Sequence, residues 1–502
     1  MVNLPIDDCH QHYCKWRLPG KAKPFGATQA AERMNDRNNA PQSPGMPDAA
    51  IAARLNRLPP SPSLWRFVLF LSFCGFFEIY EVALTAFLRP GLVRDGIFHA
   101  DSKGLLGLTD QATFAGATFA GFFAGAALFS FVADRYGRRF VLTYSLLWYA
   151  LSTVVMATRN TALEVDLWRL VAGIGVGVQL VTIDSYLAEL VPKTVRGRAF
   201  ALNYGVMYLG VPAAAFLCWL LLPIPASPMA GWRWVSLFPA LAIPVVLWTR
   251  HVVPESPRWL LQQGRLADAE RIVASIEERV AFEVREPLPA PQAEAPQPEG
   301  QTGLAELFRP AYRRRTLMLI ALNIFQALGF YGFSNWVPTL LESQGLTFVK
   351  SLQYSFAIAV VYPITPLLIA LFADRFETKW QIVTGALGTA VFGLLFARQT
   401  SPAMLVVFGA LITIFNVVLS YSYHAYQTTL YPTRIRARGV GFVYSFSRLA
   451  TVLSGFAIAI VLRDFGITGV FAFIALCMAI VVFAVAAFGP RTRGLTLEES
   501  SR

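Results

Sequence analysis

The chain contains few charged residues and few cysteines for its length. Only 15% of its 502 residues are charged, whereas 55% are hydrophobic, and this balance excludes an ordinary soluble domain. The soluble alternative, a set of buried core helices, does not explain repeated apolar runs of about 20 residues. Each run is long enough to cross the hydrocarbon core of a bilayer. The composition therefore predicts an all-α integral membrane protein.

The five cysteines do not form a disulfide framework. Cys74, Cys218 and Cys477 lie inside apolar runs, and the other two lie in the segment 9–14 with two histidines. The spacing in that segment matches no standard zinc pattern, so a solvated tail is the better interpretation. We predict no bound metal and no cofactor.

Other absences narrow the function. The sequence shows no nucleophile–base pair, no metal cluster and no phosphate-binding loop, which argues against an enzyme. No apolar stretch precedes the first long run, so we expect no cleavable signal peptide. The outer loops lack Asn-x-Ser/Thr sequons, which is compatible with a bacterial inner membrane.

The apolar runs predict twelve membrane spans, six on each side of a polar connector. We expect them at 65–88, 111–132, 140–157, 165–190, 199–222, 233–250, 315–341, 352–373, 380–397, 402–428, 438–462 and 468–488. The predicted organisation is a disordered tail at 1–63, a six-helix bundle at 64–253, a linker with short helices at 254–312, a second bundle at 313–489 and a tail at 490–502.

Lysine and arginine orient the chain. They are concentrated in the connectors that follow the second, fourth, eighth and tenth spans, and most other connectors carry single cations. By the positive-inside rule both termini and the central linker are cytoplasmic. The net charge of +12 thus reflects membrane orientation, and nucleic-acid binding is not needed to explain it.

Two sequence patterns occur once in each half. Asp134-Arg135 at the end of the second span is repeated by Asp374-Arg375, and the segment 186–198 is repeated by 426–438. Both pairs of patterns are separated by the same number of residues, which indicates two parallel structural repeats. A duplicated helical bundle in a membrane is typical of transporters.

These motifs resemble the major facilitator superfamily, in particular its sugar-porter-like branch. The resemblance covers about 65–500 and rests on the Asp134 motif and its copy, the segment 169–197, Pro254-Glu-Ser-Pro-Arg-Trp-Leu, and the segment 490–499. It implies two six-helix repeats that carry a solute by alternating access. A functional monomer in the plasma membrane is expected.

Ionic residues at the cytoplasmic ends form a candidate gate. The resemblance implies networks that hold the outward-open state, in which Glu189 pairs with Arg196; the alternative is that these charges only fix topology. The gate candidates are Asp134, Arg135, Gly137, Arg138, Glu189, Arg196, Asp374, Arg375 and Arg436. Glu377 and Thr429 depart from the pattern, so we expect a weaker latch in the second half.

The first span contains two acids, Glu78 and Glu81, whose spacing places them on one helix face. A charge at mid-membrane costs about 3 kcal/mol, so each needs a reason. In the resemblance Glu81 falls at the acid of proton-coupled members and Arg169 at its partner. The alternative is a static pair in a uniporter. Asp184 is a further proton-coupling candidate.

The solute-site candidates are Gln326, Tyr331, Trp336, His424 and Arg448. His424 stands at the repeat position of Asp184, and each of the two either serves the site or bonds locally within its own half. Arg448 in the eleventh span is a candidate counter-charge for an anion; otherwise it bonds backbone carbonyls or reaches the inner face.

Sugar transport in this branch goes with an amide-rich seventh span. Here only Gln326 and Gly329 match that pattern, and Tyr331 replaces the asparagine. We therefore expect a small organic or aromatic acid, carried with a proton. A sugar or polyol, efflux of an organic compound and a non-transporting sensor are the alternatives.

Overall fold

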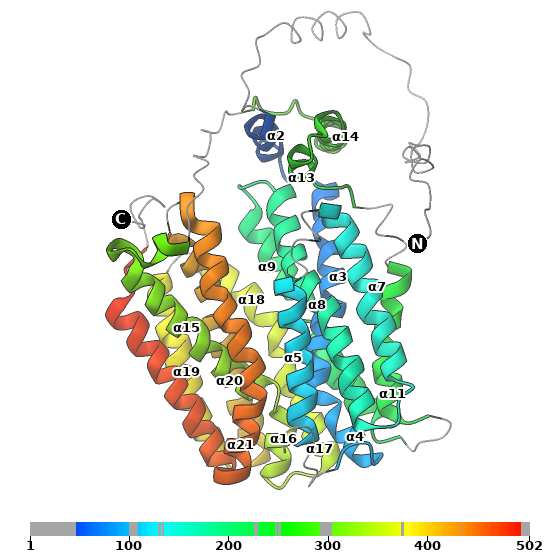
Figure 1. The fold of residues 1–502 in the computed structure, drawn as a ribbon, viewed down its shortest axis with the longest axis vertical. Coiled ribbons are helices and arrows are strands. Elements are labelled where there is room, and N and C mark those ends of the chain that lie inside the picture. The colour runs from blue at the N-terminus through cyan, green and yellow to red at the C-terminus, as the bar shows by residue number, and fades with distance from the viewer. Residues whose placement is uncertain are drawn as a thin grey trace, which may run out of the picture. The chain divides into compact units, whose positions relative to one another are not determined.

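The regular structure of this protein is helical (Figure 1). The computed structural model describes residues 47–99, 109–128, 132, 135–224, 229–245, 248, 253–291, 304–372, 376–431 and 433–492. Within these residues, nine helical segments are long and apolar enough to cross a membrane. One of them, Arg438–Phe488, is 51 residues long and accounts for two expected spans. The all-α prediction is confirmed.

The first half contains the helices of the first six expected spans. They are α3 (Pro62–Phe87), α4 (Arg89–Arg94), α5 (Asp110–Leu128), α7 (Arg138–Met156), α8 (Ala162–Leu190), α9 (Arg196–Met207), α10 (Gly210–Leu221), α11 (Gly231–Leu237) and the 3₁₀ helix η3 (Phe238–Leu241). Side-chain caps set where two of the long helices begin. Ser61 accepts a hydrogen bond from Leu64 N at the start of α3, and Thr161 accepts one from Glu164 N at the start of α8.

The second half repeats this arrangement. Its helices are α15 (Pro310–Ser334), α16 (Val337–Ser343), α17 (Phe348–Ala359), α18 (Val361–Phe372), α19 (Thr378–Ala397), α20 (Pro402–Thr429) and α21 (Thr433–Phe488). α21 comprises two helices that meet at Gly466, whose φ of 64° lies in the left-handed region. Glycine adopts that conformation without strain, so the last two spans turn back on each other there.

Prolines interrupt three spans that the sequence predicted as continuous. Pro212, Pro338 and Pro363 lie just after the α9–α10, α15–α16 and α17–α18 junctions, respectively. A proline has no N–H to bond the preceding turn, so the helix is broken just before it. Hydropathy alone does not register these breaks.

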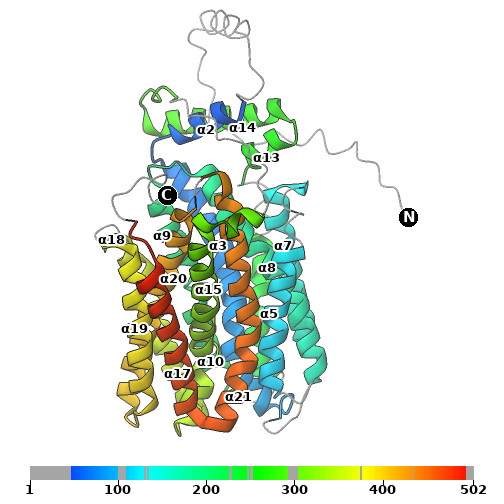
Figure 2. The same cartoon turned by 60° about the vertical axis from the view of Figure 1, so that its left-hand side comes forward.

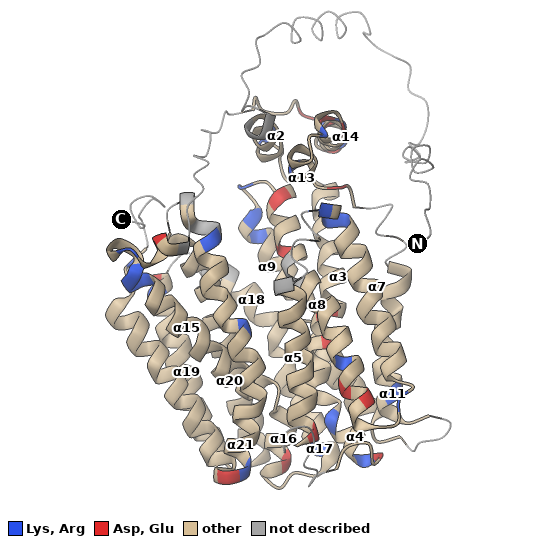
Figure 3. Ribbon diagram, viewed as in Figure 1, with Lys and Arg blue, Asp and Glu red and all other residues tan. Residues whose placement is uncertain are grey.

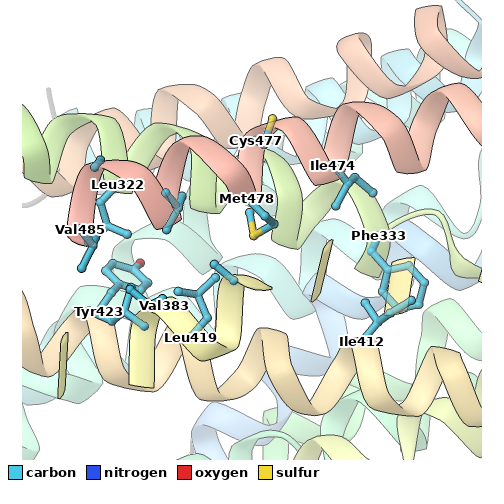
Figure 4. Packing of buried hydrophobic residues seen from close by; sticks show 14 of the residues in the cluster. Leu322, Phe333, Val383, Ile412, Leu419, Tyr423, Ile474, Cys477, Met478 and Val485 are labelled. Carbon is cyan, nitrogen blue, oxygen red and sulfur yellow. The ribbon is translucent and has the colours of Figure 1, made fainter. Parts of the chain in front are cut away.

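Charge and packing agree with helices in a bilayer. Figure 3 shows lysine, arginine and acidic residues mainly at the two ends of the helices, with few charged positions between them. Figure 4 shows one core of the second half, in which Leu322 and Phe333 of α15 pack with Leu419 of α20 and Met478 of α21. The few charges left between the ends are therefore the ones that need a functional explanation.

A helix that the sequence did not predict lies in the expected disordered tail. α2 (Pro47–Asn56) packs against α13 (Pro257–Gln262) and α14 (Leu266–Val284) of the linker, as Figures 1 and 2 show. Ile51 and Leu55 pack with Trp259 and Val273. The linker also contains η4 (Leu304–Phe308). The expected tail of 1–63 is therefore wrong for this part, while residues 1–46 lie outside the described ones.

The two halves meet through small residues and through polar contacts at one end. A Cβ on Gly116 of α5 would lie 2.3 Å from the Phe456 ring on α21, so glycine permits this close approach. At the end away from α2, Arg89 Nη1 lies 3.4 Å from Glu342 Oε2, and Gln111 donates to Thr339 Oγ1 at 3.0 Å. These contacts join the halves at the end away from α2.

Candidate functional site

A buried ion pair between Glu81 on α3 and Arg169 on α8 is the centre of the first bundle. Arg169 Nη1 lies 2.5 Å from Glu81 Oε2, and the two side chains are only 1–2% exposed. Arg169 also donates to the Glu81 backbone carbonyl. The structure thus brings together the acid and the arginine that the sequence predicted as partners.

Three threonines form further hydrogen bonds with this ion pair. Thr153 on α7 donates to Glu81 Oε1 at 2.7 Å, while Arg169 donates from Nε to Thr118 Oγ1 at 3.0 Å and from Nη2 to Thr85 Oγ1 at 3.1 Å. Both charges are therefore satisfied by direct bonds, as buried ions require. Protonation of Glu81 would remove the charge that holds Arg169, so the pair can respond to a proton.

Glu78 lies one helical turn earlier on α3 in different surroundings. Its side chain is 0% exposed, and neither carboxylate oxygen has a hydrogen-bond partner among the described residues. Asp184 on α8 and Arg448 on α21 act electrostatically on it. The two acids share a face as expected, but only Glu81 belongs to the bonded ion pair.

Arg448 reaches a cluster of tyrosines between the two halves. It donates from Nη2 to Tyr444 Oη, and its guanidinium carbon lies 4.6 Å from the centroid of the Tyr444 ring. Tyr331 and Tyr423 are also within its electrostatic reach. Within the described part of the chain Arg448 forms no ion pair with a carboxylate, so its charge is available to an anion.

Asp184 and His424 each bond within their own half. Asp184 Oδ2 accepts from Tyr204 Oη at 3.0 Å, and the His424 ring is 2.7 Å from Ser420 O through Nδ1 and 3.2 Å from Tyr423 Oη through Nε2. Arg448 acts electrostatically on both. Asp184 and His424, which hold equivalent positions in the two repeats, are therefore both influenced by the charge of Arg448.

The three remaining candidates for the solute site lie in different places. Tyr331 stacks edge-on against Phe119 of the first half at 5.1 Å and so lies at the junction of the halves. Gln326 is buried on α15. Trp336 packs in the core of the second half beside the α15–α16 break, so the structure does not group it with Arg448.

The charged gate candidates of the first half form a network, but with other partners than expected. Arg138 Nε lies 3.3 Å from Glu189 Oε1, and Ser256 Oγ donates to Glu189 Oε2. Arg196 instead donates to the Val191 carbonyl at 3.1 Å. The expected Glu189–Arg196 pair is therefore wrong, because the turn after α8 directs Arg196 back onto its own helix end.

Several gate candidates cannot be placed in this network. Arg135 is exposed, with its guanidinium carbon 5.6 Å from the Tyr136 ring centroid. Asp134, Asp374 and Arg375 lie outside the described residues, as does the side chain of Arg436 on α21. The Cys/His segment 9–14 is also outside them.

Sequence reasoning missed Glu255, although its motif had been noted. Glu255 Oε1 accepts from the backbone N–H groups of Arg138 and Arg139 at 2.9 and 3.2 Å, at the N-terminus of α7. Burial raises the pKa of Glu255 in spite of these bonds. The adjacent Gly137 has φ 96°, and a Cβ there would lie 2.4 Å from Glu255 Oε2. The signal in the sequence was the motif Pro254-Glu-Ser-Pro-Arg-Trp-Leu, which places an acid in the segment after the sixth span.

Comparisons with known proteins agree with this architecture. The family model described as "Sugar (and other) transporter" matches residues 67–502. The chain belongs to this family of the major facilitator superfamily. A putative metabolite transport protein of Bacillus subtilis, YyaJ, is 31% identical over 452 residues, which cover 89% of this chain and 96% of that protein.

One further relative and one solved structure are informative. The niacin transporter NiaP of Acinetobacter baylyi is 26% identical over 455 residues, covering 89% of this chain and 99% of that protein. The xylose transporter XylE of Escherichia coli, solved in a partially occluded inward-open conformation, superimposes with a TM-score of 0.68 at 19% identity. It is matched over its full length and over 87% of this chain, which shows the same fold. The protein is thus a membrane transporter and not an enzyme.

Proposed function

We propose that the protein moves a small organic acid across the membrane together with a proton, by alternating access of the two bundles. The observation that carries proton coupling is the buried Glu81–Arg169 pair. One proton can neutralise the acid of such a fully bonded ion pair and thereby weaken its attraction to the arginine. Facilitated diffusion with a static pair is the competing mechanism.

The driving force follows from charge. A proton that loads Glu81 from one side and leaves to the other gains about 2.3 kcal/mol for each 100 mV of membrane potential. A carboxylate carried in the same direction loses as much, so with one proton per acid the pH difference drives uptake. Neutral Glu81 no longer attracts Arg169, so the pair loosens and the bundle reorients at lower free-energy cost. With α2, α13 and α14 on the cytoplasmic side, as the positive-inside rule indicates, the outer contacts of Arg89 face the periplasm or medium.

Arg448 supports an acidic solute. It is a partly buried cation without a carboxylate partner among the described residues, and its neighbours are tyrosines that can contact an aromatic ring. The relative NiaP is a niacin transporter, and niacin is an aromatic carboxylic acid. A carboxylate on the solute would therefore complete the Arg448 environment.

A sugar or polyol is the second candidate. Gln326 on α15 is a buried amide, and an arabinose–proton symporter of Bacillus subtilis is 25% identical over 389 residues. Against it, Tyr331 stands where the sugar pattern has an asparagine, so fewer hydrogen bonds to hydroxyl groups are available. We therefore rank the acid first.

Uptake of nicotinate, benzoate, xylose and arabinitol into proteoliposomes tests the solute class. We expect uptake of at least one acid by the wild type and a loss of tenfold or more in Arg448→Gln, since a charge-assisted bond contributes about 1.5–3 kcal/mol. Arg463→Gln is the matched control, because Arg463 lies on the same helix but is exposed and paired with Asp464. Uptake of sugars alone would contradict the proposal.

A further inference from the structure

Glu78 is a buried acid whose role the Glu81–Arg169 pair does not explain. Its carboxylate is 0% exposed and has no hydrogen-bond partner among the described residues. Leaving a carboxylate buried and unbonded is costly, so Glu78 depends on a nearby cation, Arg448, to stay ionised. Glu81, three residues later, instead has direct bonds to Arg169 and Thr153.

The groups around Glu78 come from several helices. Asp184 on α8 and Arg448 on α21 are the charges that act on it, and Tyr444 on α21 and Tyr149 on α7 are within its electrostatic reach. Arg448 also acts on Asp184. One cation is therefore shared by two carboxyl groups, neither of which bonds to it directly.

The charge balance of this group depends on the solute. With both acids ionised and Arg448 charged, the group has one net negative charge, and an incoming carboxylate would add a second in a region of low dielectric constant. Like charges at close range in such a region do not remain ionised together. Binding of an anion at Arg448 therefore favours transfer of a proton from water to a carboxyl oxygen of this pair.

We propose that Glu78, with Asp184 beside it, binds a proton when the carboxylate of the solute binds Arg448. This inference rests on the proposed function, because it assumes an acidic solute. It adds a proton site at the solute, separate from the Glu81–Arg169 pair, and no covalent bond of the solute changes. The solute and its proton then occupy the site as a neutral unit.

Calorimetry of the purified full-length protein tests this separation. Nicotinate and benzoate are titrated at pH 6 to 8 in two buffers of different ionisation enthalpy, which gives the number of protons taken up per bound acid. We expect about one proton for the wild type, with an affinity that falls up to about tenfold per pH unit. Glu78→Gln should bind with little proton uptake and little dependence on pH.

The controls distinguish the two acids of α3. Asp166→Asn removes another carboxyl group of α8, which is partly buried and is influenced by Asp110 and not by Arg448, and should behave as the wild type. Glu81→Gln should still take up a proton on binding, because its carboxylate belongs to the other pair. If Glu78→Gln does not fold, Asp184→Asn replaces it and should reduce proton uptake by at least half.

The outcomes separate this inference from the proposed function. If proton uptake is undiminished in Glu78→Gln, the inference is overturned, while the acid site at Arg448 still stands. The same holds for Asp184→Asn if that variant is used in place of Glu78→Gln. Acid binding by the wild type with no proton uptake would have the same meaning. Equal binding by Arg448→Gln and the wild type, or no binding of either acid to the wild type, would overturn both.

Discussion

Glu78 and Glu81 are three residues apart on α3, yet they differ in whether their carboxylates are hydrogen-bonded. Glu81 is bonded to Arg169 and Thr153, whereas both oxygens of Glu78 are unbonded among the described residues. Helical spacing predicts that both acids lie on one face. It does not predict which neighbours meet them, because those come from α7, α8 and α21. The sequence therefore indicated the acids and the Arg169 partner, but not the division of their roles.

Gly137 provides a prediction at the same scale. Its φ of 96° is unfavourable for any side chain, and a Cβ would meet Glu255 at 2.4 Å. We expect Gly137→Ala to lower the free energy of unfolding by about 2 kcal/mol, seen as a lower melting temperature in detergent. Gly197→Ala is the control, since nothing lies within 4 Å of a Cβ there and alanine favours helix α9. Equal melting temperatures for both variants would contradict this account.

At the scale of elements, α2 is the part that sequence reasoning missed. Its apolar face, including Ile51 and Leu55, is covered by α13 and α14, and its Arg54 and Arg57 bond Glu277 of α14 at 2.6 and 2.7 Å. A polar, proline-rich tail is typical of disorder when it is considered alone. The partner that orders α2 is more than 200 residues away in the sequence, and local composition contains no information about it.

Glu277 makes the docking of α2 dependent on pH. Burial opposes the charge of Glu277, but the hydrogen bonds from Arg54 and Arg57 outweigh it and lower its pKa. A lowered pKa of an acid stabilises the docked form above the ordinary value of about 4.3, and that stabilisation is lost as the pH falls through the lowered pKa. Docking should therefore be constant from pH 6 to 8 and weaken below about pH 4.

Removing this charge at neutral pH should release α2. We expect Glu277→Gln to increase amide hydrogen exchange of residues 50–57 about thirtyfold, corresponding to about 2 kcal/mol for charged hydrogen bonds. Glu278→Gln is the matched control, because Glu278 is the next residue, carries the same charge and has an exposed side chain. Exchange that is equally slow in Glu277→Gln would show that apolar packing alone holds α2.

For the whole molecule, the order of spans and the repeat were predictable and the contacts between halves were not. Hydropathy and the repeated Asp-Arg motif are local signals, so they identified the two bundles. The contacts of Arg89 with Glu342 and of Gln111 with Thr339, at the end away from α2, join residues of two short helices and of a helix start that no motif marks. The two side chains of the Arg89–Glu342 pair are 20% and 28% exposed, so this contact is partly withdrawn from water. This burial raises the pKa of Glu342 and lowers that of Arg89.

The central claim is that Glu81 couples solute movement to a proton. The direct measurement compares wild type and Glu81→Gln in proteoliposomes that contain a pH-sensitive dye, under an imposed inward proton gradient. We expect the wild type to accumulate a transported acid with acidification of the lumen. Glu81→Gln should exchange labelled for unlabelled solute but accumulate less of it and acidify the lumen less, because only the proton taken up at Glu78 still moves with the solute. Accumulation and acidification by Glu81→Gln at the wild-type rate would contradict the account.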